Sequence, residues 1–278
     1  MYNINFEEID MESLTQFKTF NQFFTRKLKQ GIRPVKDEQD PKSMCSPCDG
    51  TVLTCGEINQ DHKTIECVKG RDYPLYEFMF GLYNREEVYA QVDKLVESSV
   101  KKGKKMFYTV IYLAPSDYHR YHSPAIFEAY NRTHITGYLD PVKPKFVNKH
   151  KDVFKYNERV NVHGKWAQGF FGISFVGALN VGSIKLNFDE TLKTNVSSPQ
   201  SPYYLDVQYS ENKENALPLD FHLKNLKDKG LNFKKADELG CFEMGSTIVL
   251  FFEADDDYDF CMSPGQKLNL GQEIFKKK

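Results

Sequence analysis

Two histidines, His119 and His122, stand three residues apart in a segment bounded by Pro115 and Pro124. The segment follows the apolar run 106–113, so we expect it at the end of a strand, where loops often carry functional groups. Histidine is the side chain best suited to move protons near neutral pH. The pattern is also typical of two hydrogen-bonded histidines in a rigid turn. Half of a metal site is a third interpretation, but further ligands are not apparent nearby.

A serine that directly follows a glycine is the second candidate. Ser246 comes after Gly245 and just before the apolar run 248–252. Because glycine has no Cβ, the peptide can adopt conformations in which the Ser246 hydroxyl attacks the carbonyl of Gly245. In isolation, the segment is far more typical of a strand that begins after a glycine.

Asp49 belongs to a third short segment, Ser46-Pro47-Cys48-Asp49-Gly50. Proline followed by Asp-Gly predicts a turn that enters a strand at Thr51. From this segment alone, Asp49 is expected to be a turn-forming residue.

The cysteines and aspartates give weak metal signals. Cys45 and Cys48 have the spacing of half a zinc site, but Cys55 and Cys67 lack the spacing that would complete it. The segment that carries Asp255, Asp256, Asp257 and Asp259 lacks the glycine and distal glutamate of a calcium loop. We therefore expect no metal site.

The composition predicts a folded chain with a large core and little net charge. Of the 278 residues, 40% are hydrophobic and 27% charged, with 37 Lys and Arg against 38 Asp and Glu. This balance argues against bulk nucleic-acid binding, and six cysteines are too few for a disulfide scaffold. The polar, acidic beginning does not have the pattern of a secretory signal. No apolar run approaches the roughly 20 residues of a spanning helix, so we expect reduced thiols and no membrane span.

Residues 13–30 are expected to form an amphipathic helix, because Phe17, Phe20, Phe24 and Leu28 follow one another at spacings of three and four. One interpretation is a surface helix docked on the core. The other is a helix that lies on a lipid surface, with its phenylalanines toward the lipid and its basic flank toward anionic headgroups.

The remaining pattern predicts many short strands and few helices. We expect one helix over 74–100, and a long polar surface excursion over 189–220. Paired glycines near the end indicate closing hairpins. Strands are expected at 51–58, 62–68, 106–113, 125–130, 159–162, 170–176, 183–188 and 248–252. The predicted fold is a single α+β domain, 1–278, with a strand-rich core, barrel- or sandwich-like, and N-terminal amphipathic helices attached.

In this order, the segments resemble the phosphatidylserine decarboxylases, a family of pyruvoyl-dependent enzymes that cleave themselves. The resemblance covers nearly the whole chain, and the histidine segment is its most specific part. Met244 stands where the family usually has leucine, and Cys48 fills a position that is often small or aliphatic. The lead before the phenylalanines is short, whereas the family often has hydrophobic or targeting sequence there. The matching segments are 20–28, 33–34, 46–50, 117–124, 157–160, 176–178, 181–184 and 239–249.

The resemblance implies a proenzyme that breaks its own backbone between Gly245 and Ser246. Ser246 would attack the Gly245 carbonyl, with His122 as its base and Asp49 holding that histidine, as in a serine-protease triad. The products would be a β chain, 1–245, and an α chain, 246–278, which stay together in the fold. Ser246 would become a covalent pyruvoyl group.

The same resemblance implies decarboxylation of phosphatidylserine to phosphatidylethanolamine through a Schiff base with the pyruvoyl group. His119 is the candidate for work in that step, such as protonating Cα. The implied partner is phosphatidylserine in a membrane, with peripheral attachment through 13–30. The mitochondrial inner membrane, an endomembrane and a bacterial inner membrane all stay open, as does a homodimer. Nucleic acid is not expected as a partner.

Two other functions fit parts of the sequence. The same pyruvoyl chemistry could act on a small soluble amino acid, although residues 13–30 favour a lipid. A β-sandwich that binds membranes without catalysis would explain the strands and the phenylalanines but would leave the ordered segments unexplained.

Overall fold

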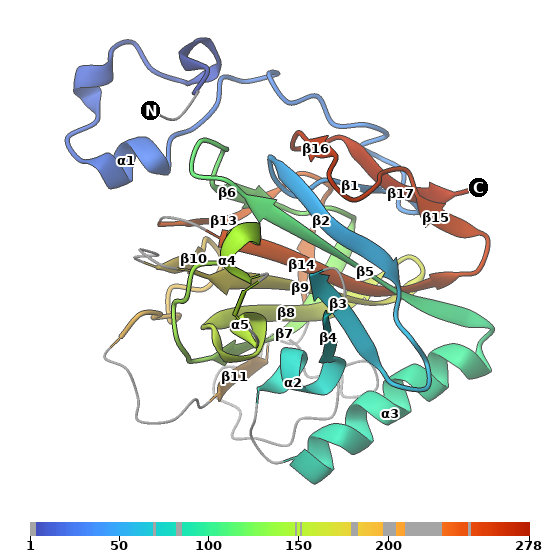
Figure 1. Ribbon diagram of the computed structural model, residues 1–278. Coiled ribbons are helices and arrows are strands. Elements are labelled where there is room, and N and C mark those ends of the chain that lie inside the picture. The colour runs from blue at the N-terminus through green and yellow to red at the C-terminus, as the bar shows by residue number, and fades with distance from the viewer. Residues whose placement is uncertain are drawn as a thin grey trace.

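An open antiparallel sheet forms the centre of the computed structural model (Figure 1). The structure describes residues 4–68, 71–81, 85–147, 149–150, 152–178, 183–196, 204–208, 230–243 and 246–278. The sheet has nine strands, and its order runs from one edge to the other without closing. The order is β11 (Tyr204–Gln208), β7 (Phe127–Ile135), β8 (Arg159–Trp166), β9 (Gly169–Gly177), β14 (Ser246–Asp255), β5 (Lys104–Leu113), β2 (Gly50–Glu57) and β16 (Lys267–Leu268), with β12 (Leu231–Phe233) also on β7.

Three smaller sheets complete the described strands. The strand-rich α+β prediction is therefore confirmed, with open sheets in place of a closed barrel among these residues. The small sheets are β10 (Ile184–Leu186), β13 (Glu238–Phe242) and β6 (Arg120–His122); β1 (Met44–Cys45), β17 (Glu273–Lys277) and β15 (Tyr258–Phe260); and β3 (Thr64–Val68) with β4 (Arg71–Pro74).

The helix predicted over 74–100 is two helices, α2 (Leu75–Phe80) and α3 (Arg85–Lys101). Gly81 ends α2 with a φ of 74°, which lies in the left-handed region that glycine adopts without steric cost. Helices α4 (Pro144–Val147) and α5 (Val153–Tyr156) are single turns. Of the predicted excursion 189–220, residues 204–208 add the edge strand β11, and 197–203 and 209–220 lie outside the described residues.

The single helix predicted over 13–30 is wrong. The structure has a 3-10 turn, η2 (Leu14–Gln16), and a five-residue helix, α1 (Phe20–Phe24). Ser13 caps the first and Thr19 caps the second, so the chain leaves the helical conformation between them and starts again. The apolar stripe is split as a result: Phe24 is buried, whereas Phe20 is 54% exposed.

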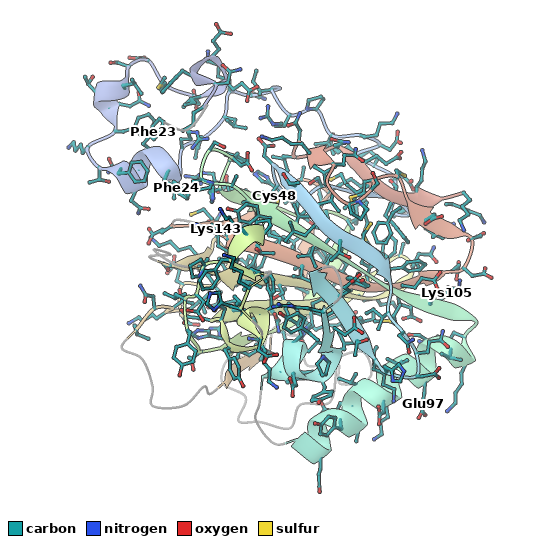
Figure 2. All side chains as sticks on the ribbon, in the orientation of Figure 1. Phe23, Phe24, Cys48, Glu97, Lys105 and Lys143 are labelled. Carbon is teal, nitrogen blue, oxygen red and sulfur yellow. The ribbon has the colours of Figure 1, made fainter. Side chains whose placement is uncertain are left out.

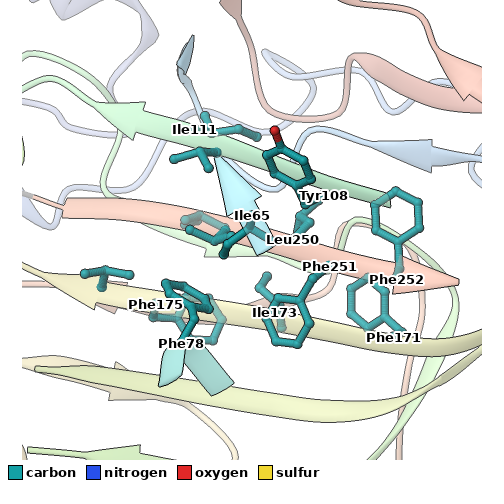
Figure 3. Close-up of a cluster of buried hydrophobic side chains, with 14 of the residues drawn as sticks. Ile65, Phe78, Tyr108, Ile111, Phe171, Ile173, Phe175, Leu250, Phe251 and Phe252 are labelled. Carbon is teal, nitrogen blue, oxygen red and sulfur yellow. The ribbon is translucent and has the colours of Figure 1, made fainter. Parts of the chain in front are cut away.

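The strand that carries Ser246 crosses the middle of the core. Strand β14 lies between β5 and β9, and its residues 246–254 are all buried (Figure 3). Both of its faces are covered, which explains why the sequence there is continuously apolar instead of alternating. On one face Phe251 packs against Phe78 of α2, and on the other Phe252 packs against Phe275 of β17.

Candidate active site

The loop that carries the histidine pair lies against the segment that leads into β14. Leu113, the last residue of β5, pairs with Ser246, the first residue of β14. Beyond the loop, β6 pairs with β13, and the His119 carbonyl oxygen accepts the Phe242 N–H at 3.0 Å. Leu113 and His119, at the two ends of this stretch, are therefore paired with Ser246 and Phe242 respectively.

Strand alternation directs Ser246 and His119 into the space between the central sheet and β6. Ser246 lies two residues before Ile248, whose direct partner on β9 is Phe175, so Ser246 shares the face of Phe175. Tyr121 of β6 stacks on Phe175 with ring centroids 4.0 Å apart, which shows that β6 covers this face. His119 is two residues from Tyr121 and continues the ladder with β13, so its side chain is directed inward as well.

His119 is held as a neutral imidazole with one nitrogen free. Its side chain is fully buried under the ring of Phe24, 3.9 Å between ring centroids. Nδ1 donates to the Asp117 carbonyl oxygen at 2.9 Å, because a carbonyl can only accept. Nε2 is then the unprotonated nitrogen, and it is buried without a partner among the described residues. Burial lowers the pKa of His119 to about 3, so the ring is uncharged at neutral pH.

Ser246 has a hydroxyl that no described group engages. The residue is fully buried, and its Oγ has no hydrogen-bond partner among the described residues. A buried hydroxyl without a partner is costly, and a catalytic role is one explanation for keeping it. The hydroxyls of Ser174 and Thr247 are also buried without a partner among the described residues, so this feature alone does not single out Ser246. Met244 and Gly245 lie outside the described residues. Of the peptide bond that we expect to break, the structure therefore describes only the Ser246 side.

His122 lies on the other side of β6 and has partners on both nitrogens. Nδ1 donates to the Ala236 carbonyl oxygen at 2.8 Å, and Nε2 accepts the Tyr118 hydroxyl at 3.2 Å. Burial lowers the pKa of His122, and its hydrogen bond to Ala236 and the nearby Asp49 charge oppose that shift. His122 is therefore a neutral imidazole that could accept a proton only after its bond to Tyr118 opens.

Asp49 is brought close to His122 but is bonded to other groups. The His122 N–H donates to the Pro47 carbonyl oxygen at 2.8 Å, so the segment of Asp49 runs beside β6. The Asp49 carboxylate accepts Nε and Nη2 of Arg33 at 2.9 and 2.7 Å, and the Leu270 N–H at 2.8 Å. Among the described residues no hydrogen bond joins Asp49 to His122. The segments that carry the two residues are hydrogen-bonded through their backbones, but the side-chain contact of the predicted triad is not formed.

Gly50 follows Asp49 because of packing. A Cβ at this position would lie 2.7 Å from Ile111 Cγ2 and 2.8 Å from the Tyr112 carbonyl oxygen. The predicted turn does lead into a strand, β2, which starts at Gly50. The glycine lets β2 approach β5 closely and so fixes Asp49 at the edge of the site.

Arg33 is a site residue that analysis of the sequence did not assign to Asp49. Its guanidinium also pairs with Glu8 at 2.7 Å, and these hydrogen bonds raise its pKa. Arg120 pairs in the same way with Glu238 of β13 at 2.6 Å. The spacing of Arg33 from Asp49 carries no periodic signal, because the contact joins two irregular segments, and so the pairing required the structure.

Metal ligands and membrane-spanning helices do not form part of the described site. In the described ranges no three His, Cys, Asp or Glu side chains are grouped as a metal ion would need. Within those same ranges, no helix is both long and apolar enough to span a bilayer. Burial raises the pKa of the Cys45 thiol to about 12 and raises that of the Cys48 thiol well above its usual value, so both are protonated.

Comparison with known proteins gives a consistent match. A family model described as phosphatidylserine decarboxylase matches residues 20–276. The chain is 36% identical over 278 residues to the mitochondrial phosphatidylserine decarboxylase proenzyme of Rattus norvegicus, with 98% of this chain and 64% of the relative covered. It is 31% identical over 341 residues to the mitochondrial phosphatidylserine decarboxylase proenzyme 1 of Saccharomyces cerevisiae, with 99% and 66% covered. It is 32% identical over 312 residues to the corresponding proenzyme 1 of Arabidopsis thaliana, with 100% and 66% covered. The chain thus spans a little less than two thirds of the length of these relatives.

Proposed function

Because this chain belongs to the phosphatidylserine decarboxylase family, we propose that it is a carboxy-lyase that converts phosphatidylserine to phosphatidylethanolamine at a membrane surface. The observation that carries the proposal is that Ser246 and His119 are both buried and that each has a polar atom without a hydrogen-bond partner among the described residues. Strand alternation directs both side chains toward the space between the central sheet and β6. A nucleophile and a proton carrier in a buried space are the parts that self-cleavage and decarboxylation need.

In this proposal the chain first breaks its own backbone. The Ser246 Oγ attacks the carbonyl carbon of Gly245, and the peptide nitrogen takes a proton and departs, so the amide becomes an ester. A base then removes the α-proton of residue 246, and the Gly245 carboxylate leaves as the new end of a β chain, 1–245. Water adds to residue 246 and ammonia departs, which leaves a ketone at the start of an α chain, 246–278.

The α chain would remain in place after cleavage because its strand is part of the core. β14 pairs with β5 over ten residue pairs and with β9 over seven. The cleaved ends lie at the start of β14, where Leu113 and Gly177 flank Ser246. Cleavage there would cut a connection and leave the central sheet intact.

The pyruvoyl group that the family resemblance implies fits this position. Residue 246 is its source, its surroundings are buried, and Gly177 beside it has no side chain to occupy the adjacent ladder position. The group would supply a carbonyl that accepts the electron pair left when a carboxylate departs as CO₂. The chain's own residues would exclude water and return a proton to the substrate Cα.

We assign the protons as the family resemblance implies. His122, with Asp49, would act as the base in cleavage. This role requires its Nε2 to leave the Tyr118 hydroxyl and, because the ring lies on the other side of β6 from Ser246, requires the histidine loop to rearrange in the precursor. His119 would deliver a proton in decarboxylation. Its inward direction and free Nε2 support this assignment, and its bond to the Asp117 carbonyl oxygen keeps the ring in the required tautomer.

Membrane contact would be made by the N-terminal segment. Three of the exposed large apolar side chains of the described residues lie there: Phe6, Leu14 and Phe20 are 47, 52 and 54% exposed. The segment projects from one corner of the molecule (Figure 1) and carries Phe24, which is labelled in Figure 2. The Phe24 ring contacts His119, with ring centroids 3.9 Å apart. A peripheral position on a membrane follows from this surface. The relatives are named mitochondrial, and we propose a mitochondrial membrane as the site of action.

Intact-mass spectrometry under denaturing conditions tests the cleavage. We expect two chains that break between residues 245 and 246, the smaller without a free amino group. Ser246→Ala should give one chain that releases no CO₂ from carboxyl-labelled phosphatidylserine in vesicles. Ser263→Ala is the matched control, because that serine is exposed in a turn of the same C-terminal part. Active protein that remains one unbroken chain would disprove the mechanism.

Paired histidine variants test the proton assignments. His122→Ala should remain uncleaved. His119→Ala should cleave and then release CO₂ about 10²- to 10⁴-fold more slowly, the contribution of a general acid or base. His62→Ala, at an exposed turn between β2 and β3, is the control. CO₂ release from free serine is compared with release from phosphatidylserine in vesicles. Release from the lipid alone supports a phospholipid substrate, and release from free serine supports a small soluble amino acid. Full decarboxylation by His119→Ala would remove its assigned role.

A further inference from the structure

Arg26 differs from the other arginines around the site in having no acidic partner. Arg33 is bonded to Asp49 and Glu8, and Arg120 to Glu238. Arg26 donates from Nη2 to the carbonyl oxygens of residues 116 and 117, at 2.9 and 3.2 Å. Its Nε and Nη1 are buried and have no hydrogen-bond partner among the described residues, and the residue is 4% exposed. The guanidinium carbon lies 5.4 Å from the centroid of the Phe23 ring, a contact that supplies no counter-charge.

The buried guanidinium of Arg26 lacks hydrogen-bond acceptors for two of its nitrogens and lacks a counter-ion among the described residues. Burial lowers the pKa of Arg26, and the charges of Asp49 and Asp117 only partly offset this effect from a distance. Charged groups are rarely buried without a counter-charge. Among the described residues no carboxylate lies within ion-pair distance of Arg26, so the arrangement calls for an anion from outside the chain.

Arg26 lines a pocket that suits an anion. The pocket has a volume of about 500 Å³ and lies between the N-terminal segment and Arg120 of β6. Its charged lining consists of four cations, Lys18, Arg26, Lys27 and Arg120, and one acid, Asp10. Thr25 and Gln22 add neutral polar groups, and Phe17 forms an apolar wall. Guanidinium groups bind phosphate oxygens through paired N–H groups.

The pocket is connected to the histidine loop by direct contacts. Arg26 binds the carbonyl oxygens of Ser116 and Asp117, just before His119. Arg120, the next residue, donates to the Thr25 carbonyl oxygen at 2.9 Å. A group bound in the pocket would therefore lie next to the loop that faces Ser246. An apolar wall on one side and basic groups on the other fit a molecule with acyl chains and an anionic linkage.

Building on the proposed function, we propose that this pocket binds the phosphodiester of the substrate phospholipid and that Arg26 is its principal ligand. The acyl chains would leave toward the exposed phenylalanine of α1, and the serine end would point to the loop of His119. Arg26 thus selects a phosphorylated substrate over a free amino acid and positions its headgroup.

Kinetics of the full-length, self-cleaved chain test the proposal first. Arg26→Gln should raise the KM for phosphatidylserine in mixed micelles about 10- to 150-fold, the range for losing a hydrogen bond between charged groups. Arg26→Lys keeps the positive charge but loses the paired N–H donors of the guanidinium, so its KM should lie between those of the parent chain and Arg26→Gln. The cleaved fraction is measured in the same samples and the rates are normalised to it, because Arg26 also holds the carbonyl oxygens of Ser116 and Asp117. Arg71→Gln is the control, because Arg71 also donates to two carbonyl oxygens, of Val147 and His150. An unchanged KM in Arg26→Gln would overturn the proposal.

Binding to the uncleaved Ser246→Ala chain tests the same site without catalysis. Titration calorimetry with glycerophosphoserine, which has the phosphodiester but no acyl chains, should give a dissociation constant that Arg26→Gln raises by the same factor. This measurement holds even if Arg26→Gln impairs cleavage, or if the wild-type chain releases no CO₂ and the proposed function fails. Inorganic phosphate should bind more weakly. Tighter binding of inorganic phosphate, or equal binding of glycerophosphoserine by both chains, would overturn the assignment to a lipid headgroup.

Discussion

Replacing Arg33 by methionine removes the clamp on Asp49 and keeps most of the side-chain volume. Nε and Nη2 of Arg33 bind both carboxylate oxygens of Asp49, and the two side chains are 12% and 8% exposed. Loss of one partner from a buried pair costs about 3–5 kcal/mol, because the other charge remains buried. Among the described residues Asp49 would keep the Leu270 N–H. For a chain of this size, about 3–5 kcal/mol corresponds to a fall in melting temperature of about 6–20 °C.

The assay separates stability from processing. Melting is measured by calorimetry in the Ser246→Ala background, where the chain is expected to stay intact. Processing is measured separately in chains with Ser246, as the rate at which the precursor mass disappears. We expect Arg33→Met to melt lower and to cleave at least about 10-fold more slowly, because Asp49 would no longer be fixed beside His122. Arg71→Met is the control, and it should lose less because its described acceptors are carbonyl oxygens.

A double-mutant cycle with Asp49→Asn isolates the pair. If the contact contributes as argued, the two single variants together should cost at least about 2 kcal/mol more than the double variant. A melting temperature within about 2 °C of the parent in Arg33→Met would refute the reasoning. The Asp49 segment would then be held by its backbone contacts.

Burial lowers the pKa of His163 to about 3, so it stays neutral in the folded chain. Between pH 6.5 and 5 the unfolded chain binds a proton at His163 that the folded chain excludes, so the free energy of unfolding falls by about 2 kcal/mol. In urea unfolding curves at the two pH values, His163→Phe should remove this fall. Phe20→Ser should leave the melting temperature and cleavage unchanged but weaken sedimentation with phosphatidylserine vesicles, because Phe20 is 54% exposed. Gly50→Ala should lower stability by about 1–3 kcal/mol and slow cleavage in a mass time course, because its Cβ would meet Ile111 and Tyr112.

Each of these variants has an outcome that contradicts its argument. An acid loss in His163→Phe as large as in the parent would assign the pH dependence to other groups. Vesicle binding by Phe20→Ser at the parent level would place the membrane contact elsewhere. Gly50→Ala with parent stability would mean that β2 and β5 can separate enough to admit a methyl group.

The sequence predicts well the strands that cross the core. It predicts the N-terminal helix poorly, because capping side chains there determine where each helix begins. The apolar runs 106–113 and 248–252 are confirmed as parts of β5 and β14, because strands buried on both faces need continuous apolar residues. Residues 13–30 have helical spacing throughout, yet Ser13 and Thr19 each start a new short helix. The periodicity therefore predicted neither the length of the helix nor a single apolar face, because Phe24 is buried and Phe20 is exposed.

The sequence identified the candidate site residues but not which of them lie close together in space, because their proximity depends on the register in which the strands pair. The position of Ser246 opposite Leu113 depends on how β14 slides against β5, and no local pattern fixes that choice. Alternation along β6 then separates the two histidines, His119 inward and His122 outward, although they are three residues apart in the chain. The sequence could name both as proton carriers, but their difference arises from the direction of a three-residue strand.

The N-terminal segment connects these separate pieces of the site. Within ten residues, Phe24 covers His119, Arg26 holds the carbonyl oxygens before it, and Arg33 holds Asp49. The same segment carries Phe20 in an exposed position. A surface that contacts lipid would therefore be continuous with the groups that position the histidine loop. Docking on a membrane would bring the phospholipid headgroup to a site whose geometry depends on the docked segment, which couples substrate capture to the arrangement of the reacting groups.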